Sequence, residues 1–212
     1  MKRIVYALVL FMAGVVAMSA RTPIRQWLVE MPDSVMPLLT RNNRLDFIDF
    51  LDSRMEAVVT NRMDGKSRMD TLTDDYLLIN YTHSCDVAMK LFPLNDTTDV
   101  LCMVTTVKAA MSDSQVAFYD EAWRHLSTPE FFVEPVMDDF RSSDRSDSAN
   151  VAWSKMDVCF KTYHLVADSA SLACRLETLD YLSRDVREAV MPYLKRDSIV
   201  YRWNGGRLMI GD

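Results

Sequence analysis

Three histidines and four cysteines are the side chains best suited to metal chemistry. His83 and Cys85 form the nearest pair, and on a strand, where alternate side chains share a face, they point the same way. A zinc site needs further ligands, and neither neighbouring segment supplies another histidine or cysteine. We therefore interpret the pair as packing plus one hydrogen bond, and we predict neither a metal nor any other cofactor.

The cysteines leave two alternatives open. Each of them lies in an apolar, strand-like stretch, and they are Cys85, Cys102, Cys159 and Cys174. Four cysteines in an exported chain allow three complete pairings. Buried free thiols and one cross-sheet disulfide both fit this pattern.

Carboxylate and hydroxyl side chains are weaker candidates for cation binding and catalysis. Four acidic residues recur at helical spacing and could bind a hard cation: Asp46, Asp49, Asp52 and Glu56. They lie opposite an apolar stripe, which is typical of a solvated helix face. Asp120 and His125 are close to a serine, yet the chain has neither a G-x-S-x-G elbow nor a His-Glu-x-x-His helix. We predict no catalytic residue, and an enzyme is the less favoured alternative.

The C-terminal residues are our candidate contacts for a ligand or partner: Tyr201, Arg202, Trp203 and Arg207. Asn204-Gly205 predicts a two-residue hairpin turn, which would place Arg202 opposite Arg207. Like charges directly across a hairpin are destabilising, so a carboxylate is expected nearby. It would come from the acidic helix of this chain or from a partner.

A helix and a series of strands must position these residues. Apolar residues at three- and four-residue spacing predict a helix over 43–58. Alternating patterns bounded by turn residues predict strands over 58–61, 66–72, 76–82, 87–94, 100–108, 115–120, 158–167 and 171–179. A helix is expected over 185–194, before the C-terminal hairpin.

Two sequence echoes indicate an internal duplication. Residues 84–91 resemble residues 169–176, and residues 113–119 resemble residues 197–203, at offsets of 85 and 84. We predict an α+β domain whose antiparallel sheet has helices packed on one face, built from two tandem repeats of helices followed by strands. The first repeat would span 21–125 and the second 126–212, packed together as one domain. The other face of the sheet is the expected place for a partner.

The first twenty residues predict export. Lys2 and Arg3 precede an apolar run over 4–18, which is short for a membrane span and typical of a cleaved signal peptide. Cleavage is expected after Ala20, or alternatively after Ala17. The remaining chain has no apolar stretch long enough to cross a bilayer. We predict a periplasmic or secreted protein.

The charge of the exported part argues against polyanionic partners. Without Lys2 and Arg3, 22 of the 24 basic side chains remain, against 30 acidic side chains, which gives a formal charge of −8. Such a surface repels nucleic acid and anionic lipid. The few glycines exclude the glycine-rich phosphate loops of nucleotide enzymes.

Several motifs together resemble a known family. They lie in residues 64–67, 72–77, 89–94, 104–107 and 113–123, and include Asp64-Gly65-Lys66-Ser67 and Met89-Lys90-Leu91-Phe92-Pro93-Leu94. This combination is similar to a family of exported, uncharacterised Bacteroidales proteins. The resemblance covers most of the chain and implies a Gram-negative envelope or secreted location, without an activity or a ligand.

Two functions follow from the sequence as hypotheses. The first is a non-catalytic module that binds an envelope or secreted protein through its sheet face or C-terminal hairpin. The alternative is a glycan- or peptide-binding protein, or a hydrolase, with a site in the cleft between the repeats. The sequence leaves the oligomeric state open.

Overall fold

The computed structural model describes residues 21–211, so the predicted signal peptide and its cleavage site lie outside the described residues. The helices are α1 (Ile24–Glu30), α2 (Arg41–Asp52), α3 (Thr128–Phe131), α4 (Asp147–Trp153), α5 (Thr178–Tyr181) and α6 (Arg184–Val190), with short 3-10 turns η1 (Met137–Phe140) and η2 (Met191–Tyr193). Within the described range, no helix is both long and apolar enough to span a membrane.

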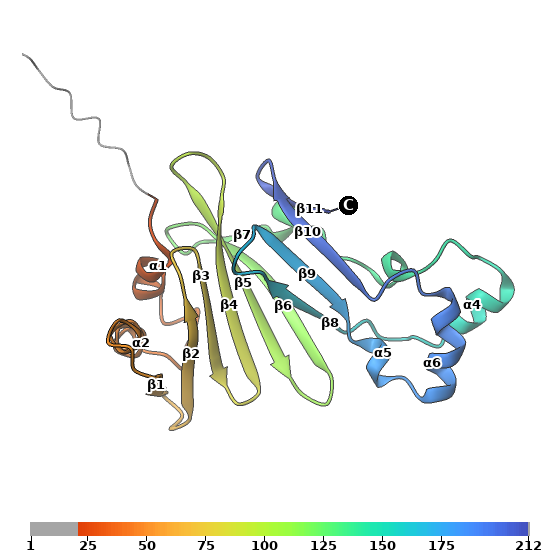
Figure 1. Cartoon of the computed structure of the whole chain (residues 1–212), viewed down its shortest axis with the longest axis horizontal. Coiled ribbons are helices and arrows are strands. Elements are labelled where there is room, and N and C mark those ends of the chain that lie inside the picture. Colours follow the sequence, from red (N-terminus) through yellow and green to blue (C-terminus); the bar gives the residue numbers. More distant parts are fainter. Residues whose placement is uncertain (1–20, 212) are drawn as a thin grey trace, which may run out of the picture.

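Eleven strands form two antiparallel sheets (Figure 1). The first sheet follows the chain order: β1 (Ala57–Thr60), β2 (Lys66–Leu72), β3 (Tyr76–Thr82), β4 (Cys85–Pro93), β5 (Asp99–Lys108), β6 (Ser112–Tyr119) and β7 (His125–Leu126). The second has the order β11 (Arg207–Ile210), β10 (Ser198–Asn204), β9 (Ser171–Leu176) and β8 (Lys161–Leu165).

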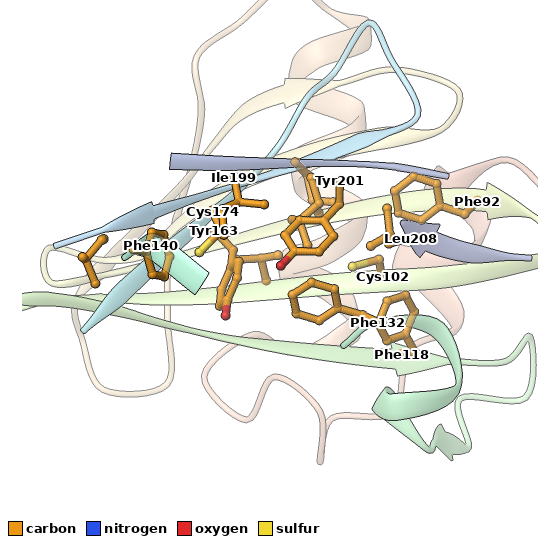
Figure 2. Packing of buried hydrophobic residues seen from close by; sticks show 14 of the residues in the cluster. Phe92, Cys102, Phe118, Phe132, Phe140, Tyr163, Cys174, Ile199, Tyr201 and Leu208 are labelled. Carbon is orange, nitrogen blue, oxygen red and sulfur yellow. The ribbon is translucent and has the colours of Figure 1, made fainter. Parts of the chain in front are cut away.

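Each face of the first sheet has its own core because side chains alternate along a strand. Leu77 and Ile79 belong to a cluster with Trp27, Leu28 and Phe47, so α1 and α2 cover that face. The side chains of the opposite face pack against the second sheet and the segment around α3, and together they form a second core. The first sheet contributes to it Tyr76, Phe92, Cys102, Val104 and Phe118. Figure 2 shows Tyr201, Phe132 and Phe118 lying together in this shared core.

The α+β class is confirmed, but the single predicted sheet is two sheets. The sheet face that we expected to meet a partner is covered by the second sheet instead. The predicted duplication stays a prediction. The first pair of similar sequences lies in β4 and β9, and the second pair lies in β6 and β10. The two halves differ in strand order, because β5 separates β4 from β6 whereas β9 pairs directly with β10.

The edge of β8 joins the two sheets. The backbone N–H groups of Lys161 and Tyr163 donate to the Asp113 Oδ1 and Ser114 Oγ atoms of β6, at 3.1 and 3.2 Å. Alternate residues of an edge strand direct their N–H groups away from their own sheet. Side chains of the first sheet therefore satisfy the open edge of the second.

Buried Lys90 makes a further link between the sheets. Its Nζ lies 3.0 Å from Asp75 Oδ2 and donates to the Ala167 carbonyl at 2.8 Å, in the loop between β8 and β9. The side chain is 2 % exposed, so its charge depends on these two oxygens.

The helix predicted over 43–58 is shorter at its C-terminal end. Thr40 and Asn43 form a reciprocal cap, which starts α2 at Arg41. Arg54 adopts a φ of 57°, a left-handed conformation that ends helices, and Val58 lies in β1. Within the helix, buried Arg44 donates to the carbonyls of Met31 and Leu39, which holds the preceding loop.

The predicted register of the C-terminal hairpin is wrong. Its turn residues are Gly205 and Gly206, with φ of 58° and 90°, so Arg202 pairs with Met209 and Arg207 with Asn204. A two-residue turn with positive φ at both central positions is of type I′, and two glycines adopt it without the steric cost that asparagine would carry. The repulsion inferred between Arg202 and Arg207 therefore does not arise.

We expect Lys90→Met to lower the free energy of unfolding by about 2 kcal/mol, because it leaves the Ala167 carbonyl without its charged donor. Urea unfolding measures this change. Lys108→Met is the matched control, since it removes an ion pair with Asp86 in which Lys108 is 40 % exposed. The control should lose no more than about 1 kcal/mol. Equal losses in the two variants would contradict a special role for Lys90.

Asp33 should contribute to acid sensitivity. A hydrogen bond from Arg44, helped by one from Arg62, lowers the pKa of this carboxyl below its ordinary value. A pKa that is lower in the folded state stabilises the fold above the unfolded pKa, and this contribution disappears as the pH falls through the folded pKa. Urea midpoints of Asp33→Asn and wild type should therefore differ at about pH 6 and converge towards about pH 2. A difference that persists unchanged at the acid end would refute this account, and Asp168→Asn serves as an exposed control.

Candidate functional site

The structure divides the four candidate residues between two faces of the second sheet. Tyr201 is 3 % exposed and its ring meets Phe132 edge to face, with centroids 4.9 Å apart. Trp203 lies on the same face of β10, two residues further on. Arg202 and Arg207 are exposed on the other face.

Trp203 anchors the C-terminal hairpin to the first sheet. Its ring stacks on Phe92 at 4.7 Å between centroids, and its Nε1 donates to the Pro93 carbonyl at 2.8 Å. Both partners lie at the end of β4. Tyr201 and Trp203 therefore have structural contacts that fix where the hairpin lies.

The two arginines keep their charges available. Within residues 21–211, neither Arg202 nor Arg207 forms an ion pair. The acidic helix that we considered as an internal partner is α2, which covers the far face of the first sheet. Arg202 lies over Gly211, whereas Arg207 lines a groove beside β11.

This groove is the candidate functional site, and we call it the β11 groove. It has a volume of about 460 Å³. One wall is β11, and Tyr201 contributes to the lining. The other wall is formed by Val133 and Pro135, in the extended stretch after α3, and by Asp139 in η1. Val133, Met209 and Ile210 are 60 %, 50 % and 52 % exposed, so apolar side chains are accessible on both walls.

The outer edge of β11 presents free backbone groups. Gly211 N–H donates to the Val200 carbonyl at 2.8 Å, which makes these two a hydrogen-bonded pair of the ladder. Because bonded pairs alternate along antiparallel strands, Arg207 and Met209 also bond to β10, while Leu208 and Ile210 direct their N–H and C=O groups outwards. Leu208 is only 2 % exposed, so the accessible backbone groups are those of Ile210. No described residue pairs with this edge, in contrast to the edge of β8.

The carboxylates of the groove are already engaged. Glu134 accepts from Lys161 Nζ at 2.8 Å and from the Tyr163 hydroxyl at 3.1 Å. Burial, with the nearby Cys174 and Glu134, raises the pKa of Tyr163, so this hydroxyl remains a donor at neutral pH. Asp139 accepts from the Val136 backbone N–H at 2.7 Å. The charge of Arg207 is thus the one most available to a bound segment.

A second cavity lies between the two sheets, and we call it the inter-sheet cleft. It has a volume of about 410 Å³ beside β8 and β9, opposite β3, β4 and β5. Its polar lining includes Asp86, Lys108, His164, Arg175 and Glu177.

The other chemical candidates are not brought together. No group of three potential metal ligands occurs in residues 21–211, and His83 faces a separate cavity near the β1–β2 turn. Asp120 accepts hydrogen bonds from Ala122 and Arg124 and so closes its own turn. Asp52 pairs with Arg25 on the surface.

All four cysteines are free thiols, which decides between the two alternatives left by the sequence. Burial raises the pKa of Cys174 to about 12. Such a thiol stays protonated near neutral pH and is a poor nucleophile and metal ligand.

The fold and the groove define an α+β protein of two packed antiparallel sheets with an open sheet edge at β11. The chain belongs to the family described as "Protein of unknown function (DUF3256)", whose model matches residues 15–208. A domain of an uncharacterised protein from Porphyromonas gingivalis W83, of the Bacteroidales, has the same fold. That structure is 24 % identical with a TM-score of 0.79, and the match covers 91 % of this chain and 100 % of the other.

A comparison with curated proteins finds no match. The family membership agrees with the predicted resemblance to an uncharacterised Bacteroidales family.

Sequence reasoning found Arg207 and Tyr201 but missed the segment 133–139 opposite them. The available signal was Pro135 between Val133 and Val136, because a proline disfavours a continuous helix and is tolerated in extended edge segments. It did not show that this segment lies beside β11.

We expect Trp203→Phe to lower the free energy of unfolding by at least about 1 kcal/mol, because a six-membered ring remains to stack on Phe92 while the hydrogen bond to Pro93 and part of the indole contact are lost. Tyr201→Phe is the matched control, since no hydrogen bond to its hydroxyl occurs within the described part of the chain. It should change stability by less than about 0.5 kcal/mol. Thermal or urea unfolding measures both, and a reversed order would contradict the anchoring role of Trp203.

Proposed function

We propose that this protein is an exported, non-catalytic module of the Gram-negative envelope that binds a partner protein in the β11 groove. The observation that carries the proposal is the open edge of β11 beside exposed apolar side chains. The partner segment would be extended and would add a strand to the second sheet. Residues 1–20, with Lys2 and Arg3 before an apolar run, support export to the periplasm or the medium.

Free edges are normally blunted in monomeric proteins, because they pair readily with other chains. Here β6 satisfies N–H groups at the β8 edge, whereas no described residue bonds to the outward groups of Ile210. Ile210, which is 52 % exposed, retains outward N–H and C=O groups that can pair with the backbone of an added strand. Val133 and Met209 would contact its alternate side chains.

Charge narrows the class of partner. Glu134 is neutralised by Lys161, whereas Arg207 has no carboxylate partner within the described residues. An acidic residue in the bound segment would pair with Arg207 without displacing an existing ion pair. We therefore favour an extended segment that carries a carboxylate between apolar residues.

The alternative function that the sequence suggested would use a different site from the β11 groove. A glycan- or peptide-binding protein, or a hydrolase, would use the inter-sheet cleft, and the volume of that cavity lies in the range of small-ligand sites. Its charged residues are paired with one another, as in Asp86 with Lys108 and Arg175 with Glu177. This arrangement favours binding over hydrolysis, which needs an acid or base free to exchange protons.

A photo-crosslinking residue in place of Val133 should capture a discrete partner in envelope preparations, whereas one in place of exposed Val200, on the outer face of the second sheet, should not. Mass spectrometry of the adduct should place the crosslink in an extended, acidic segment. Adding Ile210→Pro should abolish the adduct, because proline removes an outward N–H group.

Ile210→Val is the matched control, since it keeps that N–H group and should retain the adduct. Arg207→Glu should weaken capture about tenfold by repelling the carboxylate. Equal capture from positions 133 and 200, or an adduct unaffected by Ile210→Pro, would refute the proposal. So would an adduct composed only of two copies of this chain, which sedimentation would detect as a dimer.

A further inference from the structure

The inter-sheet cleft combines an apolar floor with charges on both of its walls. Leu78 and Ala88 line it from the first sheet, and both remain partly exposed although Tyr76, Lys90 and Val104 on the same face are buried. Leu165 lines it from the second sheet. The two sheets diverge here and leave apolar surface open.

Each wall contributes a cation and an anion. On the first sheet, Lys108 Nζ lies 2.7 Å from Asp86 Oδ1, which also accepts from Asn80 at 3.2 Å. No described residue donates to the second oxygen, Asp86 Oδ2. This carboxylate can therefore accept from an ammonium group without losing its existing bonds.

On the second sheet, Arg175 bonds to both oxygens of Glu177 at 3.1 Å and to Asp180 at 2.6 Å. Thr162 also donates to Glu177, at 2.7 Å. The Glu177 carboxylate is thus saturated, while the Arg175 side chain remains 49 % exposed. Arg175 and exposed His164 are the groups that can meet an incoming carboxylate.

The lining argues against a sugar as the ligand. Sugar rings stack on exposed aromatic faces, but the aromatic residues of the cleft, Tyr76 and Tyr163, are only 8 % and 2 % exposed. A ligand that fits must instead carry both signs of charge and an apolar part between them.

We propose that the inter-sheet cleft binds a short zwitterionic peptide, of dipeptide size, with an apolar side chain. Its ammonium group meets Asp86 Oδ2, and its carboxylate meets Arg175 and His164. The apolar side chain covers Leu78 and Ala88. Surface ion pairs contribute little stability, so Arg175 can reorient towards the ligand carboxylate at small cost, while Lys108 stays bonded to Asp86 Oδ1.

This inference rests on the alternative function, the one located in the cleft, and is independent of the β11 groove. Calorimetry with the dipeptide Ala-Leu should show saturable binding to the purified protein at millimolar concentration. The ring signals of His164 in NMR spectra should shift along the same titration curve. N-acetyl-Ala-Leu-amide, which lacks both charges, should bind at least about tenfold more weakly.

Asp86→Asn and Arg175→Gln should each weaken binding of Ala-Leu about tenfold, because each removes one charge partner. Arg202→Gln removes an exposed arginine outside the cleft and should bind like wild type. Each variant must first show an unchanged unfolding transition.

Absence of saturable binding of Ala-Leu would overturn the inference. Equal binding of the blocked peptide, or heat exchange without a shift of the His164 signals, would also overturn it. Crosslinking from Val133 does not depend on Asp86 or Arg175, so either site can fail while the other stands.

Discussion

The structure depends on which edge of the four-stranded sheet has its backbone hydrogen bonds satisfied within the protein. An edge strand carries backbone groups that need partners, and β8 obtains them from Asp113 and Ser114 of β6. This contact places the second sheet over one face of the first, where Lys90 and a shared apolar core hold it. Because β8 is used in this way, the remaining edge, β11, is the one that faces solvent.

The position of β11 is then fixed from the side of the first sheet. Trp203 stacks on Phe92 and bonds to the Pro93 carbonyl, so the hairpin cannot swing away without losing both contacts. Phe132 packs against Tyr201 and holds the opposite wall of the groove. A groove between two anchored walls is preorganised, and a bound strand loses less free energy to ordering than it would on a mobile hairpin.

Local patterns predicted most of the elements. Alternation and turn residues located the strands of the first sheet to within a few residues, because hairpin connections leave a strong local signal. The hairpin register failed because Asn204-Gly205 and Gly205-Gly206 are both favourable turns, and only the geometry of the chain decides between them. The second sheet was missed since the contact between Tyr163 and Ser114 spans 49 residues and depends on a side chain meeting a backbone edge, which periodicity does not report. For the same reason the sequence indicated Arg207 but not Val133 on the facing wall.

One strand takes part in both candidate sites. Neighbouring side chains of β8 point to opposite faces, so His164 faces the inter-sheet cleft while the Tyr163 hydroxyl bonds to Glu134 beside the β11 groove. The β8 backbone is also bonded to β6 at Lys161 and Tyr163. A displacement of β8 would therefore alter the cleft, the Glu134 contact and the join between the sheets together. The cleft is therefore lined by β8, whereas the groove depends on β8 only through the contact between Tyr163 and Glu134.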